Sequence, residues 1–383
     1  MPRITKFNSQ PLVHQLSLPY LLIPPVLFTI AAGVILATHG DLNTPQLYSQ
    51  CHARARLPAL SHIPLIGAPF CFIVSFFMFA VGSMRSVAIL APILSFVAAL
   101  LTASRVEAAR VCNQRSWNIR HPTLSWLVFN LVGGTVVWDL WIVPIFLARA
   151  KAVRIETAKS DALLGGAATS DVYEDERRIM RARSLDTRAE VFAIPAAVAL
   201  GFVVPSVLML VLKDTMSVII WLFFPLWVAA IHWIIKLEAT NLLKEKVPIY
   251  LESYPSHVTA IYIVPFVASV LTHAFFIWKM FCGDDSREMT RTAIKFIGID
   301  FAFIAATVLY WILVEAGPLP AALLVILSAF IGPGGALCVV WPFREKTICA
   351  FAIEDEESEG ESSHETNVDE TRDSVQEDTP LIR

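Results

Sequence analysis

Residues 295–315 read KFIGIDFAFIAATVLYWILVE, an apolar run with one carboxylate, Asp300, well inside its ends and another, Glu315, at its last position. Because a hydrocarbon core about 30 Å thick needs roughly twenty helical residues to cross it, this run predicts a transmembrane helix. The run before it, 259–281, places His273 at a similar depth. Ionisable groups inside a membrane are unfavourable unless they have a partner or a purpose, so these polar side chains are the first place to look for function.

Similar apolar runs occupy most of the chain. They lie near residues 20–38, 63–82, 86–104, 124–147, 191–212, 215–235, 259–281, 295–315 and 319–341. Hydrophobic residues make up 56% of the chain and charged residues 16%, and the mean hydropathy is +0.60, whereas about 25% of a soluble domain is charged. The sequence therefore predicts an all-α fold, a polytopic transmembrane helical bundle of eight or nine spans formed by residues 1–346.

Two basic segments give conflicting indications of orientation. The longest hydrophilic connection, 149–190, is rich in arginine and lysine, so the positive-inside rule predicts that it faces the cytoplasm. A second basic group lies in the preceding connection and favours the opposite orientation if a span separates the two; it consists of Arg105, Arg110, Arg115 and Arg120. Residues 347–383 form an acidic tail with few apolar side chains, which predicts disorder. The tail lies opposite the 149–190 loop with nine spans, and on the same side with eight.

The sequence lacks the motifs of metal, redox and nucleotide sites. Its six cysteines form no CxxC pair and have no histidines at ligand spacing, so neither a zinc site nor a disulfide framework is predicted. Asp284, Asp285 and Glu288 have the DDxxE spacing of some magnesium-dependent prenyl-diphosphate enzymes, but a second acidic motif is missing, and a solvated turn is expected. Without dinucleotide, haem or P-loop signatures, the sequence predicts no metal and no cofactor.

Candidate functional residues are polar or aromatic side chains inside the apolar runs. The candidate acids are Asp300, Asp139 and Glu315, and the candidate substrate-binding residues are His232, Tyr262, Phe266, His273, Tyr310 and Trp311. Structural alternatives exist for each type. The histidines can hydrogen-bond across helices, Asp300 can belong to an ion pair, and tryptophans near span ends, including Trp221 and Trp341, are typical of interfacial anchors.

A cavity lined by aromatic rings and containing a carboxylic acid suits one kind of chemistry. Removal from water favours the protonated acid, which can deliver a proton to an epoxide or an alkene, and ring faces can stabilise the carbocation that results. These are the requirements of terpene cyclisation. The same residue types also build proton-coupled transporters, in which aspartate and histidine relay protons, so both functions remain open.

Two segments near the C-terminus resemble a known family. The 295–317 stretch and the segment IGPGGALCVVWPFREK at 331–346 are similar to fungal integral-membrane terpene cyclases and cyclase-like proteins encoded in indole-diterpene and meroterpenoid biosynthetic clusters. The features that carry the resemblance are Asp300 and the Gly332-Pro333-Gly334 break, which is followed by a tryptophan and an Arg-Glu pair. The break is either a pocket wall or a site of close helix packing.

The resemblance implies a metal-independent terpene cyclase of the endoplasmic reticulum membrane. Its substrate is expected to be a prenylated aromatic compound or indole, or the epoxide of one, and no nucleic-acid partner is expected. Asp300 is the leading candidate for the acid, followed by Asp139 and Glu315. The alternative function is a transporter or another non-enzymatic membrane protein of a biosynthetic cluster. An internal repeat would favour transport, and the two halves of the sequence show no convincing similarity.

Overall fold

The computed structural model describes residues 12–39, 45, 47, 49, 51, 67–152, 181–243, 248–281 and 288–369, except the side chains of 243 and 347–369. Within these ranges the chain is helical, with two isolated β-bridges and no strands. The elements are α1 (Leu12–Gln15), α2 (Leu18–His39), α4 (Gly67–Ala80), α5 (Met84–Ala109), η2 (Val111–Asn113), α6 (Trp117–Arg120), α7 (Thr123–Val132), α8 (Gly134–Val137), η3 (Trp138–Ile142), a helix over 143–152, α11 (Glu190–Val198), η4 (Ala199–Val203), α12 (Val204–Leu212), α13 (Thr215–Leu222), α14 (Phe224–Leu243), η5 (Leu251–Ser253), α15 (Pro255–Met280), α16 (Glu288–Ala316) and α17 (Pro318–Asp369).

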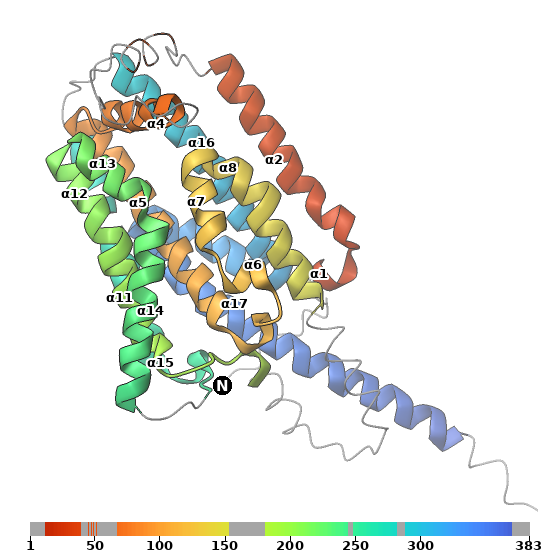
Figure 1. The fold of residues 1–383 in the computed structure, drawn as a ribbon. Coiled ribbons are helices and arrows are strands. Elements are labelled where there is room, and N and C mark those ends of the chain that lie inside the picture. Colours follow the sequence, from red (N-terminus) through yellow and green to blue (C-terminus); the bar gives the residue numbers. More distant parts are fainter. Residues whose placement is uncertain are drawn as a thin grey trace, which may run out of the picture.

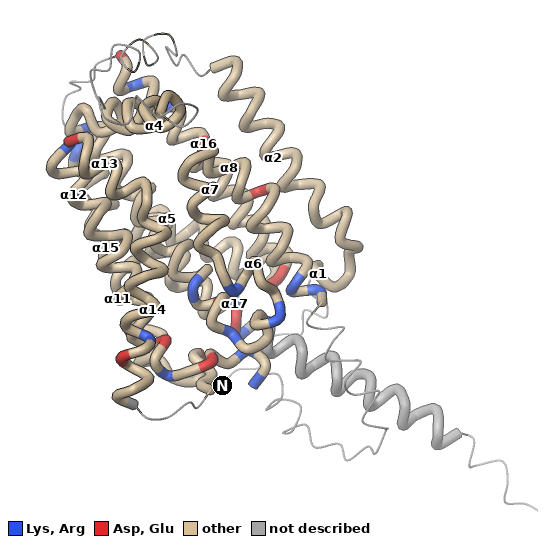
Figure 2. The backbone as a smooth tube through the Cα atoms, in the orientation of Figure 1, with Lys and Arg blue, Asp and Glu red and all other residues tan. Residues whose placement is uncertain are grey.

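The long helices pack beside one another in a bundle (Figure 1). By length and composition, six helical segments of the described chain can cross a bilayer; they are Leu18–His39, Met84–Ala109, Glu190–Leu212, Pro255–Met280, Glu288–Ala316 and Pro318–Lys346. A seventh is possible if α13 and α14, which meet at a bend of 60°, form one span. Figure 2 shows charged residues gathered toward the two ends of the bundle and sparse between them. The all-α prediction is confirmed, whereas the count of eight or nine spans is not.

The predicted span 124–147 folds back on itself instead of crossing the bundle. Trp126 and Trp138 would lie about 18 Å apart along a straight helix, but their ring centroids are 5.9 Å apart. The fold-back occurs at Gly133, where φ is +143°, a backbone conformation that residues other than glycine rarely adopt. The prediction of a span here is wrong because the two arms of a hairpin can together be as long and apolar as one crossing helix.

The last predicted span, 319–341, is also a hairpin, so Pro318–Lys346 meets the length and composition test without crossing the bundle as one straight helix. A straight helix of the 29 residues Pro318–Lys346 would be about 43 Å long. However, Arg344 near its end donates a 2.7 Å hydrogen bond to Glu315, which lies just before its start. The chain turns at Gly332, whose φ of +79° and ψ of 158° interrupt the helical backbone of α17. We refer to 123–152 and 318–346 as hairpin 1 and hairpin 2.

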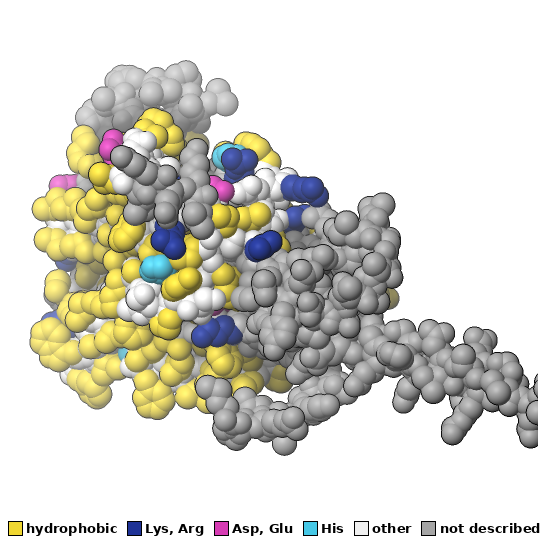
Figure 3. All heavy atoms as spheres, turned by 90° about the horizontal axis from the view of Figure 1, so that it is seen from below, with side chains coloured by type: hydrophobic (Ala, Val, Ile, Leu, Met, Phe, Trp, Pro, Cys, Tyr) yellow, Lys and Arg dark blue, Asp and Glu magenta, His cyan; other side chains and the backbone are white. Residues whose placement is uncertain are grey.

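Both hairpins enter from the end of the bundle where α5 ends, directly before Arg110, and where α6 lies; this is the lower end in Figure 1. Arg149 in the second arm of hairpin 1 donates to the carbonyl of Cys112, just before the first arm begins, so both arms start and finish at this end. The described parts of the 149–190 connection, 149–152 and 181–190, therefore lie at the same end as Arg110, so the two basic groups favour the same orientation. Figure 3, a view of this end, shows Lys and Arg side chains exposed among apolar ones.

Close packing explains the Gly-Pro-Gly break in hairpin 2. A Cβ on Gly334 would lie 2.8 Å from the carbonyl oxygen of Ser95 in α5, and one on Gly332 would lie 2.8 Å from the hydroxyl of Ser269 in α15. Neither glycine lines the main cavity of the described chain. Of the two interpretations of the break, the close approach of helices is the one observed.

The C-terminal region and the cysteines differ from the sequence-based expectations. The backbone of α17 is helical as far as Asp369, so a disordered tail beginning at residue 347 is not confirmed, and 370–383 lie outside the described residues. Cys51 and Cys71 form a disulfide with a Cα–Cα distance of 5.7 Å, although the sequence predicted no disulfide framework. Their separation of 20 residues carries no motif, because disulfide pairing depends on the fold. Asp284 and Asp285 also lie outside the described residues.

Candidate functional site

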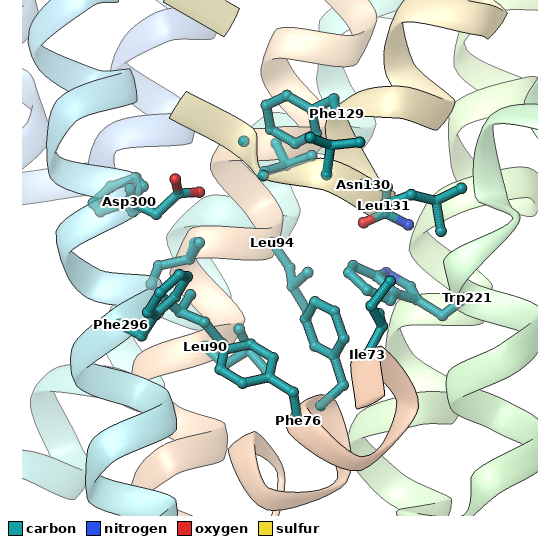
Figure 4. Close-up of a pocket in the computed structure, with 18 of the residues that line it drawn as sticks. Ile73, Phe76, Leu90, Leu94, Phe129, Asn130, Leu131, Trp221, Phe296 and Asp300 are labelled. Carbon is teal, nitrogen blue, oxygen red and sulfur yellow. The ribbon is translucent and has the colours of Figure 1, made fainter. Parts of the chain in front are cut away.

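A cavity of about 550 Å³ lies between α4, α5, the tip of hairpin 1, the α13–α14 bend and α16 (Figure 4). Its lining is aromatic and aliphatic apart from two polar side chains, Asp300 and Asn130. Nine aromatic residues contribute to the wall; they are Phe72, Phe76, Phe77, Phe96, Phe129, Trp221, Phe224, Phe296 and Phe301. A volume of this size is in the range of sites that bind small organic molecules, which are mostly apolar and have a few placed polar groups.

Asp300 lies near the middle of α16 and faces the tip of hairpin 1. The backbone N–H of Thr135 donates a 2.9 Å hydrogen bond to Asp300 Oδ1, and the Thr135 hydroxyl donates to the Asp300 carbonyl at 2.8 Å. Thr135 is in the first turn of the returning arm, where backbone N–H groups lack partners within the helix. One oxygen of Asp300 therefore caps this helix from the neighbouring α16, and the carboxyl group also borders the cavity (Figure 4).

Gly134 allows this approach because it has no side chain. A Cβ at this position would lie 2.5 Å from Asp300 Oδ2, 2.8 Å from Ile304 Cδ1 and 3.1 Å from Phe129 Cζ. Gly133 supplies the turn and Gly134 supplies the space, so the pair of glycines fits the tip of hairpin 1 against Asp300. The sequence analysis did not identify these glycines.

Asp139 is fully buried but does not line the cavity. It lies in η3, a turn of π-helix of the kind often found at functional sites. The Thr29 hydroxyl donates to Asp139 Oδ2 at 3.4 Å, and Oδ1 has no hydrogen-bond partner among the described residues. The second candidate acid therefore lies in hairpin 1 beside α2, outside the aromatic cavity.

Glu315 pairs with an arginine and also lies outside the cavity. Arg344 donates to Glu315 Oε2 at 2.7 Å through Nε, and its second guanidinium nitrogen contacts the same oxygen. Arg344 Nη1 also lies 3.5 Å from Glu107 and 3.6 Å from Glu345, and all these side chains are buried. Removing Arg344 would leave Glu315 as an uncompensated buried charge. This geometry gives Glu315 a structural role in closing hairpin 2 onto α16.

The ion pair belongs to a larger buried cluster at the lower end. Arg110 lies 2.6 Å from Glu252, 3.3 Å from Glu107 and 3.6 Å from Glu345, and it donates to the carbonyl of Arg183. Burial by itself lowers the pKa of the Arg110 guanidinium, but the three carboxylates outweigh that effect and hold this pKa well above its ordinary value. Arg110 therefore remains charged, and the cluster joins α5, hairpin 2, η5 and the segment that contains Arg183.

The two candidate histidines hydrogen-bond across helices, as the structural alternative predicted. His232 Nε2 lies 2.7 Å from Glu190 Oε2, and Lys236 lies 2.5 Å from the other oxygen of Glu190. His273 Nε2 lies 3.2 Å from the carbonyl oxygen of Ala329 in hairpin 2. Neither histidine lines the cavity.

The candidate aromatic residues also lie outside the cavity. Tyr310 donates to the carbonyl of Leu21 at 2.9 Å, and Trp311 packs edge-on against Trp341 with 4.9 Å between ring centroids. Tyr262 is buried, and Phe266 is half-buried against the core. Of the nine candidate residues, Asp300 is the one that the cavity contains. Helical spacing identified the faces of single helices, but it does not say which faces meet.

Sequence reasoning missed Asn130, the phenylalanines of α4 and the wall position of Trp221. Trp221 donates to the Ser206 hydroxyl at 3.0 Å and lines the cavity, so it is not an interfacial anchor. One signal was present in the sequence, because α4 carries four phenylalanines within 72–79 and a helix rich in rings can wall a site. Comparison with known proteins gives no further guidance, since no family model, curated protein or solved structure matches this chain.

Proposed function

We propose that this chain is a membrane-bound terpene cyclase of secondary metabolism. It acts on a prenylated aromatic compound or indole, or on the epoxide of one, by proton-initiated carbocation chemistry. The observation that carries the proposal is the presence of one carboxyl group, Asp300, among nine aromatic side chains in a cavity of about 550 Å³. An isoprenoid substrate dissolves in the bilayer, which is consistent with an enzyme that is itself largely apolar.

The proposed reaction is an isomerisation that requires no cofactor. Asp300 transfers its proton to the epoxide oxygen or to an alkene carbon, and a carbon of the chain becomes positive as the C–O bond or the π bond breaks. The π electrons of the next alkene form a new C–C bond and move the charge along the chain. Ring faces stabilise each cation, and the last one loses a proton that returns to the Asp300 carboxylate, which ends the cascade and restores the acid. The apolar wall offers water few hydrogen-bonding partners, which limits quenching of the cations.

Asp300 also caps hairpin 1, a role that is independent of any chemistry. The bond from Thr135 engages Oδ1, and we assign the transferable proton to Oδ2. The substitution Asp300→Asn separates the capping role from the proton-donating role. Asparagine keeps an oxygen that can accept from Thr135 but cannot deliver a proton.

The test is turnover in microsomes supplied with a farnesylated or geranylgeranylated aromatic epoxide. Asp300→Asn is expected to reduce product formation by about 10²- to 10⁴-fold, the usual contribution of general acid catalysis, while the protein stays folded. Asp139→Asn is the matched control, since Asp139 is buried nearby but outside the cavity. Turnover at the unmodified rate by Asp300→Asn would refute the assignment. Turnover is also expected to persist in EDTA.

A different observation favours the alternative function. Hairpins 1 and 2 interrupt the bundle at membrane depth, where irregular backbone is tolerated only if it is buried in protein or lines a cavity, and interrupted helices form substrate sites in many transporters. The apolar lining of the cavity is poorly suited to a polar solute, so cyclisation is the first proposal. Uptake of a labelled solute into sealed vesicles without chemical change would establish transport instead.

The endoplasmic reticulum membrane is part of the proposal. Two observations support it together with the family resemblance. A disulfide such as Cys51–Cys71 forms in an oxidising compartment such as the lumen of the endoplasmic reticulum. The basic lower end is expected to face the cytosol by the positive-inside rule. In this orientation the cavity opens among the lumenal halves of the helices.

A further inference from the structure

Asn130 is the polar residue of the cavity whose function is not yet explained. Figure 4 shows its amide on the side of the cavity opposite Asp300. Its nitrogen donates a 2.7 Å hydrogen bond to the carbonyl oxygen of Leu222. Because a carbonyl oxygen can only accept, this bond fixes which end of the amide is nitrogen and which is oxygen.

A structural role accounts for the nitrogen. Leu222 ends α13 directly before the 60° bend into α14, and the last carbonyls of a helix have no donors within that helix. Asn130 supplies such a donor from the first arm of hairpin 1. The bond therefore ties the hairpin to the α13–α14 bend and holds the amide plane in place.

The structural role does not account for the oxygen. Asn130 Oδ1 has no hydrogen-bond partner among the described residues, and it points into the cavity in Figure 4. The surrounding wall consists of apolar side chains such as Leu131 and Phe224, which have no hydrogen-bond donor. The indole N–H of Trp221 donates to Ser206 instead. A hydrogen-bond acceptor held rigidly on an apolar wall is a common means by which binding sites recognise a single polar group of a ligand.

We propose that Asn130 determines substrate specificity by accepting a hydrogen bond from a hydroxyl or N–H group on an otherwise apolar isoprenoid ligand. The ligand class follows from the wall: a long hydrocarbon body fits the aromatic residues, and one donor group fits Asn130 Oδ1. The further consequence, that this bond directs the opposite end of the ligand toward Asp300, depends on the proposed cyclase function. Ligands without the donor leave the amide oxygen unpaired when the cavity is filled, which costs affinity.

The test compares two probes that differ in one hydrogen-bond donor. A farnesylated phenol and its methyl ether are measured by displacement of the radiolabelled phenol from the full chain in nanodiscs. The unmodified protein is expected to bind the phenol about tenfold more tightly than the ether, as one net hydrogen bond implies. Asn130→Leu is expected to bind both probes with equal affinity. Leu131→Ala, a cavity variant without a polar change, is the control and should retain the tenfold preference.

Each outcome decides the inference. The comparison of the two probes on the unmodified protein requires no substitution, so it stands even if Asn130→Leu does not fold. Equal affinity for the two probes, or no saturable binding of either, would overturn the inference, and so would a preference that survives in Asn130→Leu. Selective binding without any cyclised product would contradict the cyclase proposal alone. Product formation without selectivity would contradict the role of Asn130 alone.

Discussion

The fit of Asp300 against the tip of hairpin 1 can be tested by replacing Gly134 with alanine. The new Cβ would lie 2.5 Å from Asp300 Oδ2, whereas ordinary contacts begin near 3.4 Å, so the carboxyl group must retreat by about 0.9 Å. Ile304 of α16 and Phe129 in the other arm of hairpin 1 lie 2.8 and 3.1 Å from the same position, so three side chains crowd the added Cβ.

Two effects are expected from this displacement. Overpacking of a buried site lowers the free energy of unfolding by about 1–3 kcal/mol. Movement of the carboxyl group also disturbs its 2.9 Å bond to Thr135 and shifts it relative to the cavity. A displacement of about 1 Å in a reacting group can reduce turnover by about 10²-fold, so we expect a loss of that order in Gly134→Ala.

Thermal unfolding in detergent and turnover in microsomes measure the two effects separately. Gly298→Ala is the matched control. Gly298 lies in α16, the helix that contains Asp300, and nothing lies within 4 Å of a Cβ added to it. Alanine in a helix is more favourable than glycine by about 0.5–1 kcal/mol, so this variant should keep or raise the Tm. If Gly134→Ala unfolds and turns over like the unmodified protein, the described contact between hairpin 1 and Asp300 is wrong.

Three further predictions concern stability. Arg344→Met should lower the free energy of unfolding by about 3–5 kcal/mol, because Glu315 is left buried and unpaired, and the double variant with Glu315→Leu should recover much of that loss in chemical denaturation. Cys51→Ser should cost about 3 kcal/mol through the loss of a cross-link between residues 20 apart, and a reducing agent should lower the Tm of the unmodified protein but not that of the variant. Asp214 caps α13 through the N–H of Ser217, and this bond lowers the pKa of its exposed carboxyl group below the ordinary 3.8. Its contribution is present above pH 3.8 and is lost as the pH falls through the lower folded-state pKa, so Asp214→Ala should lower the Tm at neutral pH and have no effect in strong acid.

Hydropathy predicted the helices that run along the full bundle and mispredicted the hairpins. Segments such as α5 and α16 were predictable because a long apolar stretch in a bilayer must satisfy its backbone hydrogen bonds internally. Each hairpin satisfies the same requirement with two short helices. Hydropathy does not show whether an apolar segment continues across the bundle or turns back. The turns were signalled only by glycines, Gly133 and Gly332, whose positive φ values become evident in the fold.

The sequence predicted one residue of the candidate site, Asp300, and gave no indication of most of the others. Asp300 stood out because a carboxylate inside an apolar run is unfavourable wherever it lies. Asn130 and the phenylalanines of α4 have no such signal, since an amide near a helix end and a ring in an apolar helix are ordinary features. Their importance depends on which helix faces them.

The sequence by itself determined that the chain is helical and resides in a membrane, because these properties follow from composition and from the length of apolar runs. The tertiary structure alone decided which carboxylate faces the cavity and which is neutralised. Asp300 and Glu315 belong to the same helix, yet Asp300 meets Thr135, which is 165 residues away, and Glu315 meets Arg344, which is 29 residues away. The state of a buried charge depends on the groups within a few ångströms, and only the folded chain brings those groups together.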